Sequence, residues 1–292
     1  MRILGPEQAF AQQYFQREEP LTNAELEIER TLVKRTAEYR PNFDDFEDVY
    51  SLAEISKDKE RLAQQKQTEQ REIHRRTLIS EAILADQIEK SNWFGENCCT
   101  AVASDYDDHF SHTDLILEFN QKEKIVRLAV DITMAEDPEI LEKKRNYIKK
   151  DIEKGQLTNL KYFASEADPS LKGRILGIPR VIIGVDKGLI HKLSGMIVSK
   201  KTKELAQGAV QLHLLKAVKS QLESEIKYTE LYFRKDAKKR IFIANKHKEI
   251  LKIINQVLKQ KEKALGNATE PRENIDWSGD IKGLEYLSQQ GY

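Results

Sequence analysis

The sequence has few of the residues and motifs that mark several common classes of protein. It contains only 2 cysteines among 292 residues, at the adjacent positions Cys98 and Cys99. Because neighbouring strand residues point to opposite faces, we expect no disulfide or metal pair there. No apolar run approaches the roughly 20 residues of a membrane-spanning helix. The N-terminal segment MRILGPEQAFAQQYFQREEP lacks the apolar core and cleavage site of a secretory signal. The sequence therefore predicts a cytoplasmic protein without a membrane partner.

Glycine-rich phosphate-binding motifs are also missing. The 13 glycines form no GxxxxGK[ST] pattern, which disfavours an NTP-driven enzyme. Charged residues are abundant at 33%, and 39% of the residues are hydrophobic, as in a helix-rich protein with solvated faces. The net charge is zero, yet residues 191–263 hold 18 lysines and arginines against 7 acidic residues. This basic stretch can meet phosphate, although solvated helix faces explain the same charge.

The chain divides at a polar segment near residue 70. Before it, Thr22 and Glu25 have the spacing of a capping box at the start of a predicted helix. We expect residues 1–70 to form a helical arm, which is also a candidate surface for a protein partner. Residues 71–265 are predicted to form an α/β domain with basic C-terminal helices, and residues 266–292 an irregular tail.

The predicted α/β domain has its strands in the middle. A helix ending near Gly95 precedes the short strand CCTAVAS and two stronger strands, TDLILEF and KIVRLAVDITM, joined by a polar turn. A helix then starts at Pro138. The strands NLKYFAS and PRVIIGVD follow, and the second is apolar throughout, as expected of a strand covered on both faces. This order predicts a mixed sheet flanked by helices.

Two aspartates lie at the ends of apolar strands that are predicted to pair. Asp114 opens TDLILEF, and Asp131 follows KIVRLAV. If the two strands pair, these carboxylates lie close together, and they repel each other unless a cation lies between them. Mg²⁺ is commonly bound by one or two carboxylates and several waters, and it can activate a water for attack on phosphate. The candidates for a third acid, on the preceding helix, are Glu81, Asp86 and Glu89.

This order of acids and elements, over residues 78–185, resembles the core of the PD-(D/E)XK nuclease superfamily, which has the restriction-endonuclease-like fold. The resemblance implies that Asp114 is the aspartate of the hairpin, Asp131 the second acid and Glu81 the helix acid. It further implies that Asp114 and Asp131 hold Mg²⁺ or Mn²⁺. The expected function is metal-dependent hydrolysis of phosphodiester bonds in DNA or RNA.

One position departs from the superfamily pattern. The signature has a lysine two residues after the second acid, and Thr133 stands there instead. A threonine hydroxyl can hydrogen-bond a water but carries no positive charge. Thr133 therefore keeps a second function open, in which a non-catalytic protein of the same fold binds nucleic acid or serves as a structural or assembly component.

A lysine from another element can replace the missing one. Lys144 is the best candidate, because it shares a helix face with Ile140 and Ile148, which are expected to pack on the sheet. Snorkelling of the lysine side chain explains the same position. Lys161, in the following strand, is a weaker candidate.

Two further clusters have less specific patterns. A zinc site from His109 and His112 with Asp107 or Asp108 lacks a second His/Cys cluster, which favours a polar loop. Near the C-terminus, aromatic and basic residues are adjacent and can either stack on bases or pack in the core: Tyr228, Tyr232, Phe233, Arg234 and Lys235.

Overall fold

The computed structural model describes residues 20–68, 75–135, 138–266 and 282–289. Along these residues the elements follow in the order α2 (Asn23–Ile28), the π-helix η1 (Glu29–Val33), α3 (Lys34–Glu38), the 3₁₀ helix η2 (Phe43–Phe46), α4 (Leu52–Thr68), α5 (Arg75–Ser91), β1 (Cys98–Val102), α6 (Asp105–Ser111), β2 (Leu115–Gln121), β3 (Lys124–Met134), α7 (Pro138–Glu153), β4 (Thr158–Ala164), β5 (Lys172–Ile178), β6 (Arg180–Val185), α8 (Lys187–Val198), α9 (Thr202–Gln207), α10 (Val210–Tyr232), α11 (Ala237–Gly266) and α12 (Lys282–Gln289).

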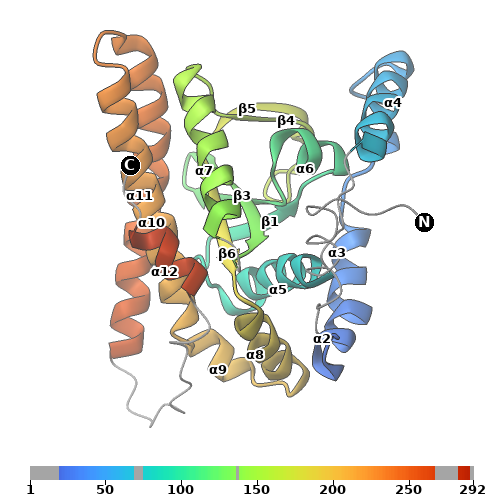
Figure 1. Cartoon of the computed structure of the whole chain (residues 1–292), viewed down its shortest axis with the longest axis vertical. Helices are drawn as coiled ribbons and strands as arrows, with labels where there is room; N and C mark the ends of the chain where they lie inside the picture. The colour runs from blue at the N-terminus through green and yellow to red at the C-terminus, as the bar shows by residue number, and fades with distance from the viewer. Residues whose placement is uncertain (1–19, 69–74, 136–137, 267–281, 290–292) are drawn as a thin grey trace, which may run out of the picture.

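A four-stranded mixed sheet in the order β1-β2-β3-β6 forms the centre of the molecule (Figure 1). β1 and β2 are antiparallel, as are β2 and β3, whereas β6 runs parallel to β3. The strands β4 and β5 form a separate antiparallel pair. The predicted α/β class, with a mixed sheet and flanking helices, is therefore confirmed.

Strand alternation gives the sheet two apolar faces. Leu117 of β2 and Leu128 of β3 face the main core, together with apolar side chains of α5, α8, α10 and α11. Ile116 and Ala129, one position along each strand, face the opposite side, where Phe163 of β4 packs on them. Asp131 has the same parity as Ala129, so it belongs to this second face, and Asp114 directly precedes β2.

The strand β6 is buried along its whole length, as its apolar sequence predicts. Ile183 faces the main core, while Ile182 packs with Leu141 and Ile148 of α7. Ile140 was also expected to pack on the sheet, and this was wrong, because its side chain is 43% exposed. The buried face of α7 is rotated by one position, and Leu141 takes the expected place of Ile140.

Several elements were missed in the sequence, among them α8 and α9. Residues 105–111, expected to be a loop, form α6, in which the Ser104 side chain caps the N-terminus and acidic residues fill the first turn. β5 contains Gly173 and Gly177, both with positive φ. These glycines break the alternation of apolar and polar side chains that predicts a strand. Part of the predicted irregular tail is α12, which contacts β6.

The N-terminal helices pack closely on the rest of the chain. Thr22 and Glu25 form the predicted capping box, and Ile28 and Leu32 are buried in the main core. Glu25 also forms a buried ion pair of 3.2 Å with Arg76 of α5. The helices α2 and η1 thus contact α5 and α8, and the separability of residues 1–70 stays a prediction.

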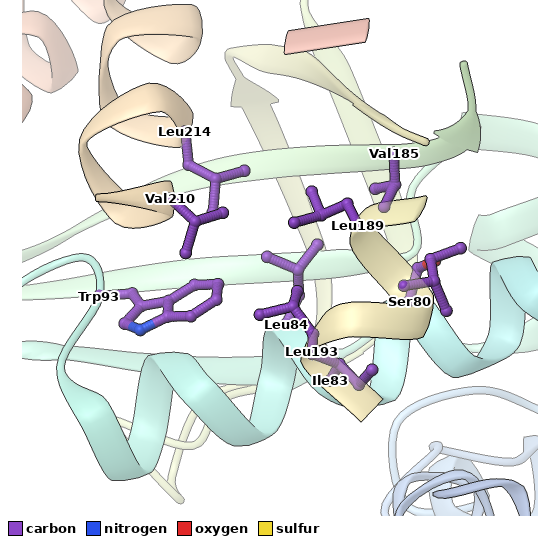
Figure 2. A pocket seen from close by; sticks show the side chains of 10 residues that line it. Ser80, Ile83, Leu84, Trp93, Val185, Leu189, Leu193, Val210 and Leu214 are labelled. Carbon is purple, nitrogen blue, oxygen red and sulfur yellow. The ribbon is translucent and has the colours of Figure 1, made fainter. Parts of the chain in front are cut away.

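A small cavity in the main core shows how tightly these layers pack. Its volume is about 10 Å³, and Figure 2 shows apolar side chains such as Trp93, Leu189 and Leu214 around it. This volume is about that of one water, and the walls offer almost no polar group, so the cavity is a packing gap. Trp93 and Phe94 are fully buried, and Trp93 Nε1 donates a hydrogen bond to the Leu205 carbonyl. Within the described ranges, no helix is long and apolar enough to cross a bilayer.

Candidate functional site

Asp114 and Asp131 lie at the same end of the β2–β3 pair. The strand register pairs Leu115 with Val130, and the Asp114 N–H donates to the Val130 carbonyl at 2.9 Å. Asp114 therefore lies beside Val130, the residue directly before Asp131 in β3. Both are buried, with exposures of 6% and 4%. The Asp114 Oδ2 atom accepts a hydrogen bond of 2.5 Å from the Ile132 N–H, which fixes this carboxyl beside β3.

Lys144 of α7 reaches the same end of the sheet. Its Nζ forms an ion pair with Asp131 Oδ1, and the two side chains are 25% and 6% exposed. α7 begins directly after β3, so its second turn returns over the strand end that carries Asp131. Thr133 lies two residues further along β3 and is 9% exposed. A lysine of α7 thus contacts the second of the two predicted acids.

Glu81 brings a third acid toward these residues from α5. It is 6% exposed, and Arg40 Nη2 lies 3.3 Å from its Oε2. The same guanidinium lies 3.4 Å from Asp105 and 3.6 Å from Asp108, both in α6. Arg40 lies in the connection between α3 and η2. Its guanidinium therefore links an acid of α5 to acids of α6.

Four acids at this end of the sheet influence one another electrostatically, and we define them as the acid cluster: Glu81, Asp108, Asp114 and Asp131. Burial raises the pKa of Asp114 well above its usual range, and the charges of Glu81, Asp108 and Asp131 raise it further. Burial also raises the pKa of Glu81 to about 7, opposed by Arg40 and reinforced by Asp108 and Asp131. A raised pKa means that the ionised form of the carboxyl group is destabilised, and a bound cation would stabilise that form.

The buried acid Glu118 shows how a structural carboxylate differs. It lies in β2 and is fully buried, yet it is surrounded by donors. Its oxygens accept hydrogen bonds from Arg127 at 2.7 Å, from the Ser165 hydroxyl at 2.7 Å and from the Glu166 N–H at 2.7 Å. Asp114 accepts a backbone hydrogen bond from the Ile132 N–H. The charges of Glu81, Asp108 and Asp131 raise its pKa, and the charge of Lys144 opposes them.

The other helix acids belong to different contacts. Asp86 forms ion pairs with Arg35 and Lys90, and Glu89 accepts a 2.6 Å hydrogen bond from the Thr100 N–H. Of the three candidates on α5, Glu81 is therefore the one that contributes to the acid cluster.

Lys161 also lies away from the acid cluster. Its Nζ is 2.5 Å from Asp58 and 2.6 Å from Glu54, both in α4. This lysine joins β4 to α4 and does not take the place of the signature lysine.

Residues of the candidate zinc site make other contacts in the structure. Asp107 accepts hydrogen bonds from the backbone N–H groups of Lys161 and Tyr162 at 2.7 and 2.8 Å. The His112 ring stacks on Tyr147 of α7. In the described part of the chain, no three His, Cys, Asp or Glu side chains are grouped as metal ligands. A zinc site in α6 therefore has no support.

The chemistry of the acid cluster nevertheless fits a hard divalent cation. Its donors are carboxylate oxygens, which Mg²⁺ and Mn²⁺ prefer. The two cationic side chains Lys144 and Arg40 already contact Asp131 and Glu81. A metal would therefore compete with these side chains for the carboxylates, and the Mg²⁺ or Mn²⁺ site stays a prediction.

The C-terminal aromatic residues are divided between core and surface. Phe233 is buried, while Tyr232 is 51% exposed. Tyr228 stacks on Tyr232 and donates a hydrogen bond to Glu153 of α7.

Sequence reasoning missed Arg40, Asp105 and Asp108 as members of the site. Asp105 and Asp108 lie in the segment that was expected to be a loop, and Arg40 stands in a polar connection without any local motif. Comparison of the chain with protein-family models, with curated proteins and with solved structures finds no match.

Proposed function

We propose that this protein is a metal-dependent nuclease that hydrolyses phosphodiester bonds in nucleic acid at the acid cluster. The observation that carries the proposal is the ion pair between Lys144 and Asp131 beside the buried Asp114. A pair of acids can hold the cation that activates water for such hydrolysis, and a nearby lysine can orient that water. The order α5, β1, β2, β3, α7, β6 and the mixed sheet are in keeping with the PD-(D/E)XK resemblance, with β4 and β5 added before β6.

Each residue has a distinct role in the proposed reaction. Asp114 and Asp131 would hold Mg²⁺ or Mn²⁺, and Glu81 would orient a metal-bound water or complete the ligand set. The bound cation would supply Lewis-acid polarisation of the phosphate and a water of lowered pKa. Lys144, close to Asp131, is placed to orient the attacking water or to stabilise negative charge on the phosphate. The Thr133 hydroxyl can hydrogen-bond that water.

The proposal is tested by cleavage of labelled DNA and RNA, single-stranded and double-stranded, with Mg²⁺ or Mn²⁺ and with EDTA as the control. We expect cleavage that requires the metal and that Asp131→Asn abolishes, because the substitution removes the charge that holds the cation. Asp86→Asn is the matched control, since Asp86 is a buried acid outside the cluster, and it should retain cleavage. Metal-independent cleavage, or cleavage that survives Asp131→Asn, contradicts the proposal.

A second function is favoured by one specific observation. Thr133 replaces the signature lysine, and Lys144 and Arg40 already neutralise part of the acid cluster. A non-catalytic protein that binds nucleic acid or acts as an assembly component would have the same features. Binding of nucleic acid without cleavage by either metal would favour this alternative. A protein partner on residues 1–70 and a cytoplasmic location remain predictions in both cases.

A further inference from the structure

One face of α7 carries three lysines and a tyrosine at helical spacing. Lys143, Tyr147, Lys150 and Lys154 follow one another at intervals of four, three and four residues, which places them on one side of the helix. All four are exposed, Tyr147 to 36%. The opposite side of α7 packs in the core through Leu141, Ile148 and Ile152. We call these four residues the α7 stripe.

Tyr147 holds a defined position next to the acid cluster. It lies one helical turn after Lys144, whose Nζ contacts Asp131. Its ring stacks on His112 with centroids 5.2 Å apart and planes at 14°. His112 ends α6 in the left-handed conformation, so the two rings join the C-terminal end of α6 to α7. The result is a flat, partly exposed aromatic surface at the edge of the site.

The lysines of the α7 stripe stand on either side of this aromatic surface. Lys143 precedes Tyr147 by one turn, and Lys150 follows it, with its Nζ 6.0 Å from the Tyr147 ring centroid. Lys154 directly follows the last residue of α7, about 16 Å from Lys143 at 1.5 Å per residue, and its Nζ lies 3.9 Å from Asp151 Oδ1. Positive charges spaced along an exposed aromatic ring match a strand of phosphates with accessible bases.

We propose that the α7 stripe, together with His112, is the binding surface for a single-stranded nucleic acid. An unpaired base stacks on Tyr147, and Lys143, Lys150 and Lys154 contact the phosphates on either side. A paired base cannot offer its face to the ring, so the surface selects single strands over duplexes. The inference rests on the proposed nuclease for its placement beside the cluster, and it specifies the substrate class of that site.

The aromatic contact is tested by binding in EDTA, so that cleavage does not enter. The probes are labelled DNA and RNA oligonucleotides of about 12 nucleotides, single-stranded or as duplexes, followed by fluorescence anisotropy. Tyr147→Leu should weaken single-strand binding about tenfold or more and leave duplex binding unchanged. Tyr147→Phe keeps the ring and should keep the affinity. Phe242→Leu is the control, because Phe242 is an exposed aromatic residue of α11, and it should bind as the unaltered protein does.

The phosphate contacts are tested by the triple substitution of Lys143, Lys150 and Lys154 by Gln. The slope of log affinity against log salt should fall by about 2, since each phosphate contact with a single strand contributes about 0.7. The charge-matched control replaces Lys246, Lys252 and Lys259 on α11, all exposed. Lys252 and Lys259 line an open groove without an aromatic side chain, and their loss should change the slope by much less. Melting curves and circular dichroism check that each variant is folded.

The outcomes separate this inference from the proposed function. Single-strand binding that depends on Tyr147 and on the three lysines, without cleavage by either metal, supports the surface and overturns the nuclease. Metal-dependent cleavage with equal binding of Tyr147→Leu and unaltered protein overturns the surface and leaves the nuclease standing. The inference is also overturned if duplexes bind as tightly as single strands, if the α11 control loses as much affinity, or if no nucleic acid binds.

Discussion

The Lys144 ammonium and the Asp131 carboxylate form an ion pair that joins the second turn of α7 to the end of β3. Asp131 is almost fully buried, and the Lys144 side chain retains a quarter of its exposure. Thr133, two residues beyond Asp131, occupies the strand position at which the resemblance implies a lysine. The positive charge next to Asp131 therefore comes from α7 and not from β3. Substitutions at positions 133 and 144 can test whether the two positions are equivalent.

A lysine placed at strand position 133 should restore part of the cleavage rate that is lost when Lys144 is replaced. Lys144→Met keeps the apolar stem and removes the charge, and we expect it to lower the cleavage rate by about 100-fold. Adding Thr133→Lys to that variant restores a positive charge beside Asp131 and should regain part of the rate. Single-turnover cleavage measures both. A folded double variant as slow as Lys144→Met would show that Lys144 does not replace the signature lysine.

The pKa of Glu81 predicts a pH-dependent stability. Its folded-state pKa of about 7 lies above the ordinary value of 4.5, so the folded protein binds the proton more tightly. The stability that this proton contributes is present below pH 4.5 and is lost as the pH rises through 7. Ionised Glu81 then costs about 3 kcal/mol, at about 1.4 kcal/mol per unit.

Glu81→Gln removes this ionisation and should change the stability most at high pH. Relative to the unaltered protein, the variant should gain about 1–3 kcal/mol in unfolding free energy between pH 5 and pH 8. Urea unfolding at the two pH values measures the difference. An identical difference at both pH values would mean that Glu81 ionises as freely in the folded chain as in the unfolded one.

Arg40 should compete with a metal for the acid cluster. Its guanidinium is 3.3 Å from Glu81 and 3.6 Å from Asp108, where a cation would also be attracted. Arg40→Gln should therefore raise the Mn²⁺ affinity several-fold, measured by calorimetry at about pH 8.5 so that Glu81 is ionised despite its raised pKa. Arg35→Gln is the control, because Arg35 pairs with Asp86 outside the cluster. Equal effects of the two substitutions, or weaker binding by Arg40→Gln, would contradict the competition.

Local patterns predicted one part of the site and missed another for a physical reason. Asp114 and Asp131 were predicted as neighbours because strand alternation and a short hairpin determine their faces and register. Lys144 was singled out because it shares a helix face with Ile140 and Ile148, which were expected to pack on the sheet. Arg40 and Asp108 could not be found in this way, since their contact depends on how the connection after α3 packs against α6. Tertiary packing of this kind leaves no periodic signal in the sequence.

The elements that were missed show the same limit. α6 is a short polar helix whose main signals are a serine cap and acids in its first turn, a composition that a loop also has. In α7 the lysine was identified, but Ile140 was expected on the buried face that Leu141 in fact occupies. A difference of one position is 100° around a helix, and it depends on the direction in which the helix crosses the sheet.

Glu118 and Asp114 should respond in opposite ways to loss of their charge. Glu118→Ala leaves Arg127 and several donors without their acceptor, and we expect a loss of about 3 kcal/mol or more in unfolding free energy. Asp114→Asn relieves repulsion from the other acids and should cost less than about 1 kcal/mol, or stabilise the protein. Chemical unfolding at pH 8 measures both. A large destabilisation by Asp114→Asn would indicate a structural carboxylate.

The most direct test of the account is the anomalous scattering of a crystal grown with Mn²⁺. We predict a peak between Asp114 and Asp131, within about 2.1 Å of a carboxylate oxygen of each, and no such peak in a crystal of Asp131→Asn. The same map would show whether Lys144 has moved away from Asp131 toward the space of the attacking water. A well-ordered site without an anomalous peak, with the Lys144–Asp131 ion pair intact at saturating Mn²⁺, would contradict a metal-dependent reaction at these acids.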